Sequence, residues 1–329
     1  MRGAHSVAGA DAGIRVESGT PGWPRGQLFP NPERTSVDYA QAIILGLIQG
    51  VTELFPVSSL GHSVILPAFF GWSNVVAAQS APESFFLAFL VGLHVATALA
   101  LAVFYRDQWV RTIRGLLRSL RRRRIETLGE RLGWLLVVAT IPAGLVGLLL
   151  EHQLRVLFAT PVAAAGFLMV NGVVLLAGER IRRRAEVRAV VAAHQQTPSG
   201  DRRLDSLEFR EAGVVGVAQV FALLAGISRS GITMVAGLVR GLDHEDAARF
   251  SFLLATPVIL AAGVYKLPDL LGPNGDGVRG QVLAGSVAAA IAAYVSVRFL
   301  SRYFTRRTLT PFAIYSLVLG AAALLRFGL

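Results

Sequence analysis

The sequence predicts an all-α polytopic membrane protein, and three observations carry that prediction. Of its 329 residues, 53% are hydrophobic and only 16% are charged, a balance that is unusual for a soluble domain of this length. Several apolar runs reach or approach the ~20 residues that a helix needs to cross a bilayer. The formal net charge is +11, and the basic residues gather between these runs, as in cytoplasmic loops of membrane proteins. This distribution, without a recognisable nucleic-acid-binding module, argues against a nucleic-acid partner.

Composition divides the chain into a leader and one transmembrane domain. Residues 1–37 are rich in Gly, Pro, Ser and Arg and lack the apolar core of a secretory signal, so we predict a disordered leader. Residues 38–329 are predicted to form a single transmembrane domain. The chain contains no cysteine, which excludes disulfides, thiolate metal sites and a cysteine nucleophile.

The apolar runs predict two interrupted segments and about six full transmembrane helices. The first interrupted segment covers residues 39–57 and 62–72, with Pro56 breaking its helix. Neither piece spans a bilayer comfortably, so we expect a re-entrant helical hairpin, which is tolerated at membrane depth where it lines a cavity. The second interrupted segment covers residues 212–241 and is broken at residues 228–231. The full spans are predicted over residues 85–105, 132–150, 156–177, 250–265, 282–300 and 312–325.

Charge between the spans predicts the orientation of the chain. Residues 106–131, 179–210 and 301–309 are rich in arginine and are predicted to be cytoplasmic loops. Residues 73–84 and 267–280 then face outward. The first hairpin enters from outside and the second from the cytoplasm, so that their broken tips approach each other near the middle of the membrane.

A shift of 170 residues aligns the two interrupted segments and predicts an inverted-topology repeat with two re-entrant helical hairpins. The repeat halves cover about residues 38–178 and 208–329, and the charge distribution independently gives them opposite orientations. The identical pairs are Ala42 and Ala212, Gly46 and Gly216, Gln49 and Gln219, Leu54 and Leu224, Ser58 and Ser228, and Gly61 and Gly231.

Each interrupted segment contains a short polar stretch within apolar sequence. The first motif, residues 49–62, reads QGVTELFPVSSLGH, and the second motif, residues 225–233, reads AGISRSGIT. Polar and ionisable side chains are expensive inside a membrane and mark functional sites. We therefore predict that the two motifs meet and form one site for a phosphate-bearing lipid.

Arg229 is the strongest candidate for binding phosphate. A guanidinium flanked by serines offers a rigid fork that matches phosphate oxygens. A nearby glycine lets the backbone approach a ligand, and a broken helix leaves free N–H donors that favour an anion. The alternative is a structural arginine tied to carbonyls or to Glu53. The predicted phosphate-binding set is Ser58, Ser228, Arg229, Ser230, Gly231 and Thr233, with helix capping as the alternative role for Ser58 and Ser228.

Glu53 and His62 are candidates for the chemistry itself. Glu53 is predicted to bind a hard cation such as Mg²⁺ or Ca²⁺, to accept a proton, or to pair with Arg229. His62 is a candidate general acid or base, or a nucleophile towards phosphorus. It follows Ser59 by three residues, which places both side chains on one helical face. The alternative for His62 is a buried side chain that only forms hydrogen bonds. A role in support of the site, or a hydrogen bond between helices, is open for His94.

At these two motifs the sequence resembles the undecaprenyl-diphosphate phosphatase family, also called bacitracin-resistance proteins. The matching residues are 49–59 with Gly61-His62, and residues 226–233. Residues 250–255 and 311–315 resemble family segments as well. The resemblance implies a multi-pass enzyme of the bacterial cell membrane that removes the terminal phosphate from undecaprenyl diphosphate. The product, undecaprenyl phosphate, carries cell-wall precursors.

The resemblance also implies the residues and the cofactor of the reaction. It implies a divalent cation, Mg²⁺ or Ca²⁺, bound by Glu53, with Gln49 as a further candidate ligand. The family often has glutamate at the position of Gln49, so this chain lacks one metal-binding carboxylate. The catalytic residues carried over from the family are Glu53, Ser59, His62 and Arg229.

Two other functions compete with a diphosphatase. A transporter or flippase of a phosphorylated lipid or anion would also suit an inverted repeat, because such repeats support alternating access. A phosphatase of the phosphatidic-acid-phosphatase type is disfavoured, because its Lys-x₆-Arg-Pro motif is missing and the only lysine is Lys266. The expected partners are a polyprenyl diphosphate lipid and the bilayer, and a homodimer is left open.

Overall fold

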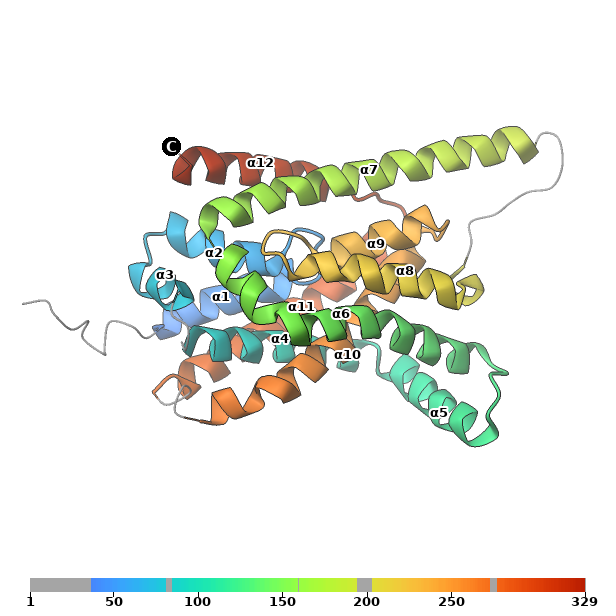
Figure 1. Ribbon diagram of the computed structural model, residues 1–329, viewed down its shortest axis with the longest axis horizontal. Helices are drawn as coiled ribbons and strands as arrows, with labels where there is room; N and C mark the ends of the chain where they lie inside the picture. The colour runs from blue at the N-terminus through green and yellow to red at the C-terminus, as the bar shows by residue number, and fades with distance from the viewer. Residues whose placement is uncertain (1–36, 81–84, 159, 194–202, 273–276, 329) are drawn as a thin grey trace, which may run out of the picture.

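The structure, a computed structural model, describes residues 37–80, 85–158, 160–193, 203–272 and 277–328. These residues form helices, and no strand occurs among them. Many of the longer helices run along the long axis of the molecule (Figure 1). The leader predicted for residues 1–37 lies outside the described residues, apart from Val37.

Twelve α-helices and two short 3₁₀ turns make up the described chain. The first part contains α1 (Tyr39–Thr52), α2 (Ser59–Phe69), α3 (Ser73–Ser80), α4 (Phe85–Phe104), α5 (Arg106–Arg122), α6 (Leu128–Phe158) and α7 (Pro161–Ala193). The second part contains η2 (Leu204–Ser206), α8 (Phe209–Val220), η3 (Phe221–Leu223), α9 (Arg229–Val239), α10 (His244–Leu271), α11 (Arg279–Tyr303) and α12 (Thr310–Phe327).

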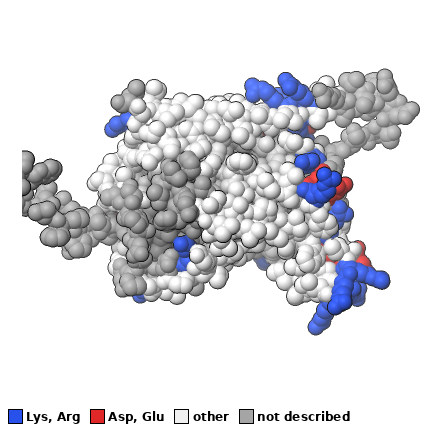
Figure 2. All heavy atoms as spheres, in the orientation of Figure 1, with Lys and Arg blue, Asp and Glu red and all other residues white. Residues whose placement is uncertain are grey.

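The length and polarity of these helices make the chain a multi-pass membrane protein. Five helices of the described chain, α6, α7, α10, α11 and α12, are long and apolar enough to cross a membrane. A sixth span results if α4 and α5, which are bent by 87° where they join, are counted together. Figure 2 shows a middle region almost free of Lys and Arg, which gather mainly at the end of the molecule that carries α5.

Close packing of small residues brings the helices together. Among the most extensive helix contacts are those of α1 with α11 and of α7 with α12. Gly46 of α1 lies against the backbone of Gly285 in α11, where a side chain would overlap the Gly285 carbonyl. One turn later, Gly50 lies equally close to Ala289. Small residues four apart on both helices allow this approach, as is typical of helix pairs in membranes.

Several helices are longer than the apolar runs that predict them. Residues 106–131, predicted as a loop, contain α5, whose polar face (including Gln108 and Thr112) is buried. Helix α6 continues through residues 151–155, where a short loop was expected, and α7 continues into the basic segment 179–210. Hydropathy marks only the apolar part of a helix, and arginine and glutamate are themselves good helix formers.

Candidate active site

Both interrupted segments contain a break, and the two breaks contact each other. The first break lies at residues 53–58, around Pro56 as predicted. The second lies at residues 224–228 and not at the predicted 228–231, because Ser228 caps α9 and residues 229–231 form its first turn. The hydroxyl of Ser58, between α1 and α2, accepts a hydrogen bond from the amide of Gly226, between η3 and α9, at 3.2 Å. A Cβ atom on Gly61 would come within 2.9 Å of the Gly226 Cα, so this contact requires glycine. Gly226 also has a φ of +110°, which side-chain-bearing residues rarely adopt. The predicted meeting of the two motifs is therefore present.

Serines cap both helices that begin at this contact. The Ser58 hydroxyl accepts a hydrogen bond from the amide of Gly61 at 3.2 Å. In the same way, the Ser228 hydroxyl accepts one from the amide of Gly231 at 3.1 Å. These caps fix the N-termini of α2 and α9 beside each other. Because a helix N-terminus carries unpaired N–H groups and a partial positive charge, the pair of N-termini favours an anion.

Asn171, in the middle of α7, ties the two breaks together. Its side chain accepts a hydrogen bond from the amide of Ser228 at 2.9 Å and donates one to the carbonyl of Pro56 at 3.0 Å. It also donates to the hydroxyl of Ser316 at 3.2 Å. The sequence interpretation missed this residue. An amide alone in an apolar span is a signal that could have identified it.

Glu53 lies at the centre of a buried polar cluster, with a side chain only 6% exposed. Its Oε1 pairs with the guanidinium of Arg229, which lies 176 residues further along the chain. Its Oε2 accepts a hydrogen bond from the Ser59 hydroxyl at 2.5 Å and one from the Gln49 amide at 2.9 Å. The Nε2 of His94 lies 3.4 Å from the same oxygen. A buried carboxylate needs such partners, because leaving it unpaired would be costly.

A cavity of about 130 Å³ adjoins this cluster. At roughly 30 Å³ for each water molecule, it has room for about four waters, which suits one phosphate group and not a whole lipid. The first residues of α2 and α9 line this cavity, and so do the two partners of the ion pair, Glu53 and Arg229. The lining residues are Thr52, Glu53, Ser58, Ser59, Leu60, His94, Ala222, Ile227, Ser228, Arg229 and Ile259.

His62 points away from this cavity, although it follows Ser59 on the same helix. Its Nδ1 lies 2.7 Å from the Ser58 carbonyl, which only accepts hydrogen bonds, so Nδ1 carries the proton of the neutral ring. Its Nε2 then accepts a hydrogen bond from the hydroxyl of Tyr315 at 2.8 Å, and the two rings stack. The contacts within the protein therefore use both ring nitrogens.

Three residues of the predicted phosphate-binding set do not line the cavity. Ser230 contacts the Ser228 hydroxyl at 3.0 Å and the Phe55 carbonyl at 3.3 Å. Thr233 bonds to Ser251 at 2.7 Å, and Gly231 serves the cap of α9. The geometry gives these three residues contacts that hold α9 in place.

The cavity offers few ligands for a divalent cation. No group of three or more His, Cys, Asp or Glu side chains suited to a metal occurs in the described part of the chain. Glu53 supplies the one carboxylate of the cavity lining. Gln49 does not line the cavity, but it contacts Glu53, and its Oε1 is buried with no hydrogen-bond partner among the described residues. A single carboxylate suits a cation that takes most of its other ligands from substrate phosphate and water, as Mg²⁺ commonly does.

Comparison with known proteins gives consistent matches over most of the chain. The family model described as "Bacitracin resistance protein BacA" matches residues 42–322. Undecaprenyl-diphosphatase 2 of Frankia alni is 56% identical, with 88% of this chain and 98% of that protein covered. Undecaprenyl-diphosphatase of Mycolicibacterium paratuberculosis is 58% identical, covering 88% and 97%. Undecaprenyl-diphosphatase 2 of Chromobacterium violaceum is 44% identical, covering 87% and 97%.

Proposed function

Since the chain belongs to the bacitracin resistance protein BacA family, we infer that it is an undecaprenyl-diphosphatase. It hydrolyses undecaprenyl diphosphate to undecaprenyl phosphate and inorganic phosphate, which recycles the lipid carrier for cell-wall synthesis. One observation of this chain supports the activity most directly. Arg229 of the second motif, Glu53 of the first motif and the hydroxyl of Ser59 meet beside a cavity the size of a phosphate group.

Arg229 and the two helix N-termini bind the diphosphate in this proposal. The guanidinium lies on the cavity wall, and its fork matches two phosphate oxygens. The N-termini of α2 and α9 add unpaired N–H groups and partial positive charge on the same wall. In the absence of substrate, Glu53 neutralises Arg229. Incoming phosphate oxygens compete for the guanidinium and free one carboxylate oxygen of Glu53.

Ser59 is the nucleophile that the geometry supports best. Its hydroxyl already donates to Glu53 Oε2 at 2.5 Å, the arrangement in which a base activates a weak nucleophile. The Ser59 oxygen attacks the terminal phosphorus, its proton passes to Glu53, and the bond from that phosphorus to the bridging oxygen breaks. Undecaprenyl phosphate leaves, and water then hydrolyses the phosphoserine to release inorganic phosphate. Fixed donors around the phosphoryl group stabilise its charge in the transition state.

His62 acts as a positioning residue in this proposal. Its hydrogen bonds with the Ser58 carbonyl and the Tyr315 hydroxyl hold the first turn of α2 against α12. This turn carries Ser59, so a change at His62 displaces the nucleophile without removing it. Gln49 and His94 hold the Glu53 carboxylate in a similar way, from α1 and α4.

A divalent cation, Mg²⁺ or Ca²⁺, completes the proposed site. Glu53 and the free amide oxygen of Gln49 would hold it, and when bound it would neutralise charge on the phosphate oxygens. In this arrangement the amide oxygen of Gln49 takes the place of the second carboxylate that the family often has at this position. Loss of activity in chelator and its return with added Mg²⁺ or Ca²⁺ would test the requirement.

We propose that the domain of residues 38–329 is an inverted repeat whose interrupted helices are re-entrant. Helix packing supports this topology. Helices α1 and α8 are counterparts at the 170-residue shift, and each packs on one long helix: α1 on α11, and α8 on α6. With the arginine-rich end in the cytoplasm, the chain lies in the bacterial plasma membrane. The orientation can be tested by labelling single cysteines placed in residues 73–80 and 302–307 from outside intact cells.

Phosphate release distinguishes this function from a transporter or flippase. Purified protein in detergent, without a closed membrane, should release phosphate from a polyprenyl diphosphate. A transporter would move the lipid between leaflets in vesicles and release no phosphate in detergent. Absence of turnover in wild-type protein that binds the lipid would overturn the diphosphatase assignment.

A further inference from the structure

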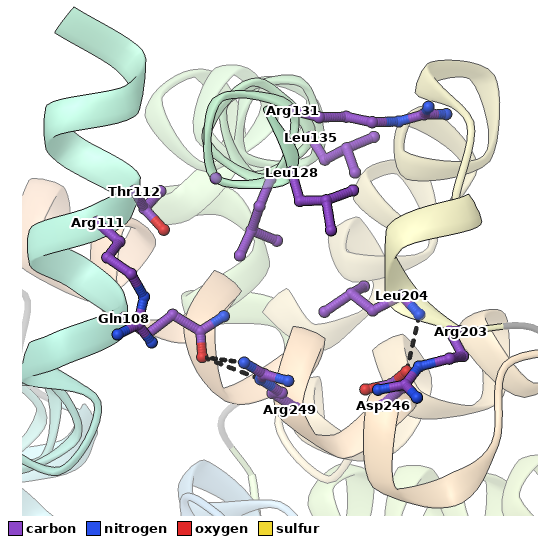
Figure 3. A pocket seen from close by; sticks show the side chains of 12 residues that line it. Gln108, Arg111, Thr112, Leu128, Arg131, Leu135, Arg203, Leu204, Asp246 and Arg249 are labelled. Carbon is purple, nitrogen blue, oxygen red and sulfur yellow. Dashed lines mark hydrogen bonds between the residues drawn. The ribbon is translucent and has the colours of Figure 1, made fainter. Parts of the chain in front are cut away.

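A second cavity lies at the end of the molecule where basic residues collect, and it shares no lining residue with the candidate active site. Its volume is about 340 Å³. Figure 3 shows its walls: Gln108 and Arg111 from α5, leucines from α6, Arg203 beside η2, and Arg249 from α10. Segments that are far apart in sequence thus line one open cavity.

The charge of this cavity is strongly positive. Four arginines line it (Arg111, Arg131, Arg203 and Arg249), against one acid, Asp246. Asp246 uses its Oδ2 to accept the amide of Leu204 at 2.7 Å. Four positive charges and one negative charge leave a net charge of +3 on the lining. A cavity of this kind attracts an anion.

The hydrogen-bond donors of the cavity have few acceptors. Arg249 donates from Nε and Nη2 to the neutral Oε1 of Gln108, at 2.9 and 2.7 Å. The buried Nε of Arg131 has no hydrogen-bond partner within the part of the chain that the structure describes, although its Nη2 donates to the Leu207 carbonyl at 2.9 Å. No ion pair joins any of the four cavity arginines to an acid within the described ranges. A guanidinium fork bound to a neutral amide is matched better by phosphate oxygens.

The α6 wall of the same cavity is apolar. Leu128, Leu132 and Leu135 lie on one face of α6, and Leu128 is 62% exposed. Arginines next to an exposed leucine are the surroundings of a membrane-embedded head group, with phosphate on one side and an acyl chain on the other.

From this combination we propose that the cavity between α5, α6, η2 and α10 binds a phosphate group, carried by an anionic lipid of the bilayer. Arg111, Arg131, Arg203 and Arg249 contact the phosphate oxygens, and Leu128 and Leu132 contact the start of the acyl chain. The site lies at the end of the molecule that the arginine distribution assigns to the cytoplasm. Free inorganic phosphate has the same chemistry at its oxygens but no apolar part.

Lipid binding to full-length protein in phosphatidylcholine nanodiscs tests the proposal. The probes are dioleoyl phosphatidic acid, dioleoyl phosphatidylcholine and inorganic phosphate, each followed by native mass spectrometry. The cavity variant is Arg111→Gln/Arg203→Gln, since both side chains are exposed. The matched control is Arg114→Gln/Arg118→Gln, which makes the same charge change on exposed residues of α5 outside the cavity.

We expect wild type and control to bind phosphatidic acid in preference to phosphatidylcholine, and the cavity variant to bind it roughly 30-fold more weakly. Inorganic phosphate should not displace the lipid. If inorganic phosphate binds wild type, and the cavity variant loses that binding, the site is a phosphate site whose ligand is free phosphate. Equal loss of lipid in the cavity and control variants would overturn the proposal, because general surface charge would then explain binding. Matching thermal unfolding of the two variants would show that both are folded.

Discussion

Ser58 in the first motif and Ser228 in the second motif occupy equivalent positions at the 170-residue shift. Each caps the helix that follows, and each does so through the amide of a glycine three residues later. Gly46 and Gly216 are also equivalent, and each lies where a side chain would overlap a backbone carbonyl of a neighbouring helix. The residues that the two motifs share therefore set the path and the packing of the backbone.

The residues that differ between the motifs carry the charge and the chemistry. Ser59 of the first motif aligns with Arg229 of the second, and Glu53 aligns with Leu223. The two motifs thus share capping and packing residues but present different groups to the candidate site. The candidate active site needs both copies, because one supplies the carboxylate and hydroxyl and the other supplies the guanidinium.

Gln49 and Gln219 occupy equivalent positions in the two segments but differ in their hydrogen-bond partners. Both bury an amide oxygen for which the described residues provide no hydrogen-bond partner. Gln49 donates to Glu53, whereas Gln219 donates to the Ala139 carbonyl at 3.4 Å. Of the two, only Gln49 hydrogen-bonds to a carboxylate, so identical side chains have different surroundings. The comparison teaches that the shared serines and glycines set packing, whereas the charged groups of the candidate site occur where the motifs differ.

The largest expected effect comes from removing the proposed nucleophile. Ser59→Ala should lower kcat for phosphate release by at least about 10⁴-fold, because the hydroxyl that attacks phosphorus is gone. Ser230→Ala, which removes a hydroxyl of the second motif outside the cavity lining, serves as the control. Single-turnover phosphate release measures both. If kcat of the Ser59→Ala enzyme stays within ten-fold of the wild-type value, water and not Ser59 is the nucleophile.

Arg229, aligned with Ser59, should give the next largest effect. Arg229→Gln is expected to lower kcat/KM by about 10³-fold, because a fixed donor to the transferred phosphoryl group is lost. Arg229→Lys should recover only part of this loss, since an ammonium lacks the planar fork. Steady-state kinetics with a polyprenyl diphosphate would decide. Full recovery by lysine would show that charge alone is required.

Substitution of Asn171 removes the hydrogen bonds that link the two motifs. Asn171→Ala leaves the Ser228 amide and the Pro56 carbonyl buried without a partner, at a cost of about 1–3 kcal/mol in the free energy of unfolding. Asn171→Asp keeps the acceptor for Ser228 but places a buried carboxylate oxygen against the Pro56 carbonyl, so a cost at least as large as that of alanine is expected. Unfolding in detergent monitors both variants. Unchanged stability of Asn171→Ala would mean that packing alone holds the motifs together.

The two capping serines should differ modestly. Each loss of a cap costs about 1 kcal/mol in unfolding free energy. Ser58→Ala should cost about 1 kcal/mol more than Ser228→Ala, because the Ser58 hydroxyl also satisfies the amide of Gly226. The same unfolding assay compares them. Equal costs would indicate that the Gly226 amide finds another acceptor.

The smallest effect is expected at Thr233, which the sequence predicts to bind phosphate. Its hydroxyl bonds to Ser251, and its side chain does not line the cavity. Thr233→Val should therefore leave kcat/KM within about three-fold of wild type. A loss comparable with that of Arg229→Gln would restore the predicted phosphate contact and require a shift of α9 on substrate binding.

Sequence patterns predicted much of the fold because a membrane imposes local rules. Apolar runs marked the spans, and Pro56 with the glycines and serines of the motifs marked the breaks. Helix ends were less predictable, since the polar face of α5 is stabilised by packing and not by hydropathy. Within the site, the proximity of Glu53 and Arg229 was foreseen. The contacts of Asn171 were not, because its partners come from distant segments.

The sequence by itself determined the class of protein, the approximate positions of the helix breaks and the identity of the polar groups within them. These are properties of a single segment, because the length of an apolar run and the residues that interrupt it follow directly from the order of residues. Only the tertiary structure decided which polar group meets which. It turned His62 towards Tyr315 and left Ser59 beside Glu53, although both residues begin the same helix. The direction of a side chain depends on the neighbours that packing brings to it, and these come from other parts of the chain.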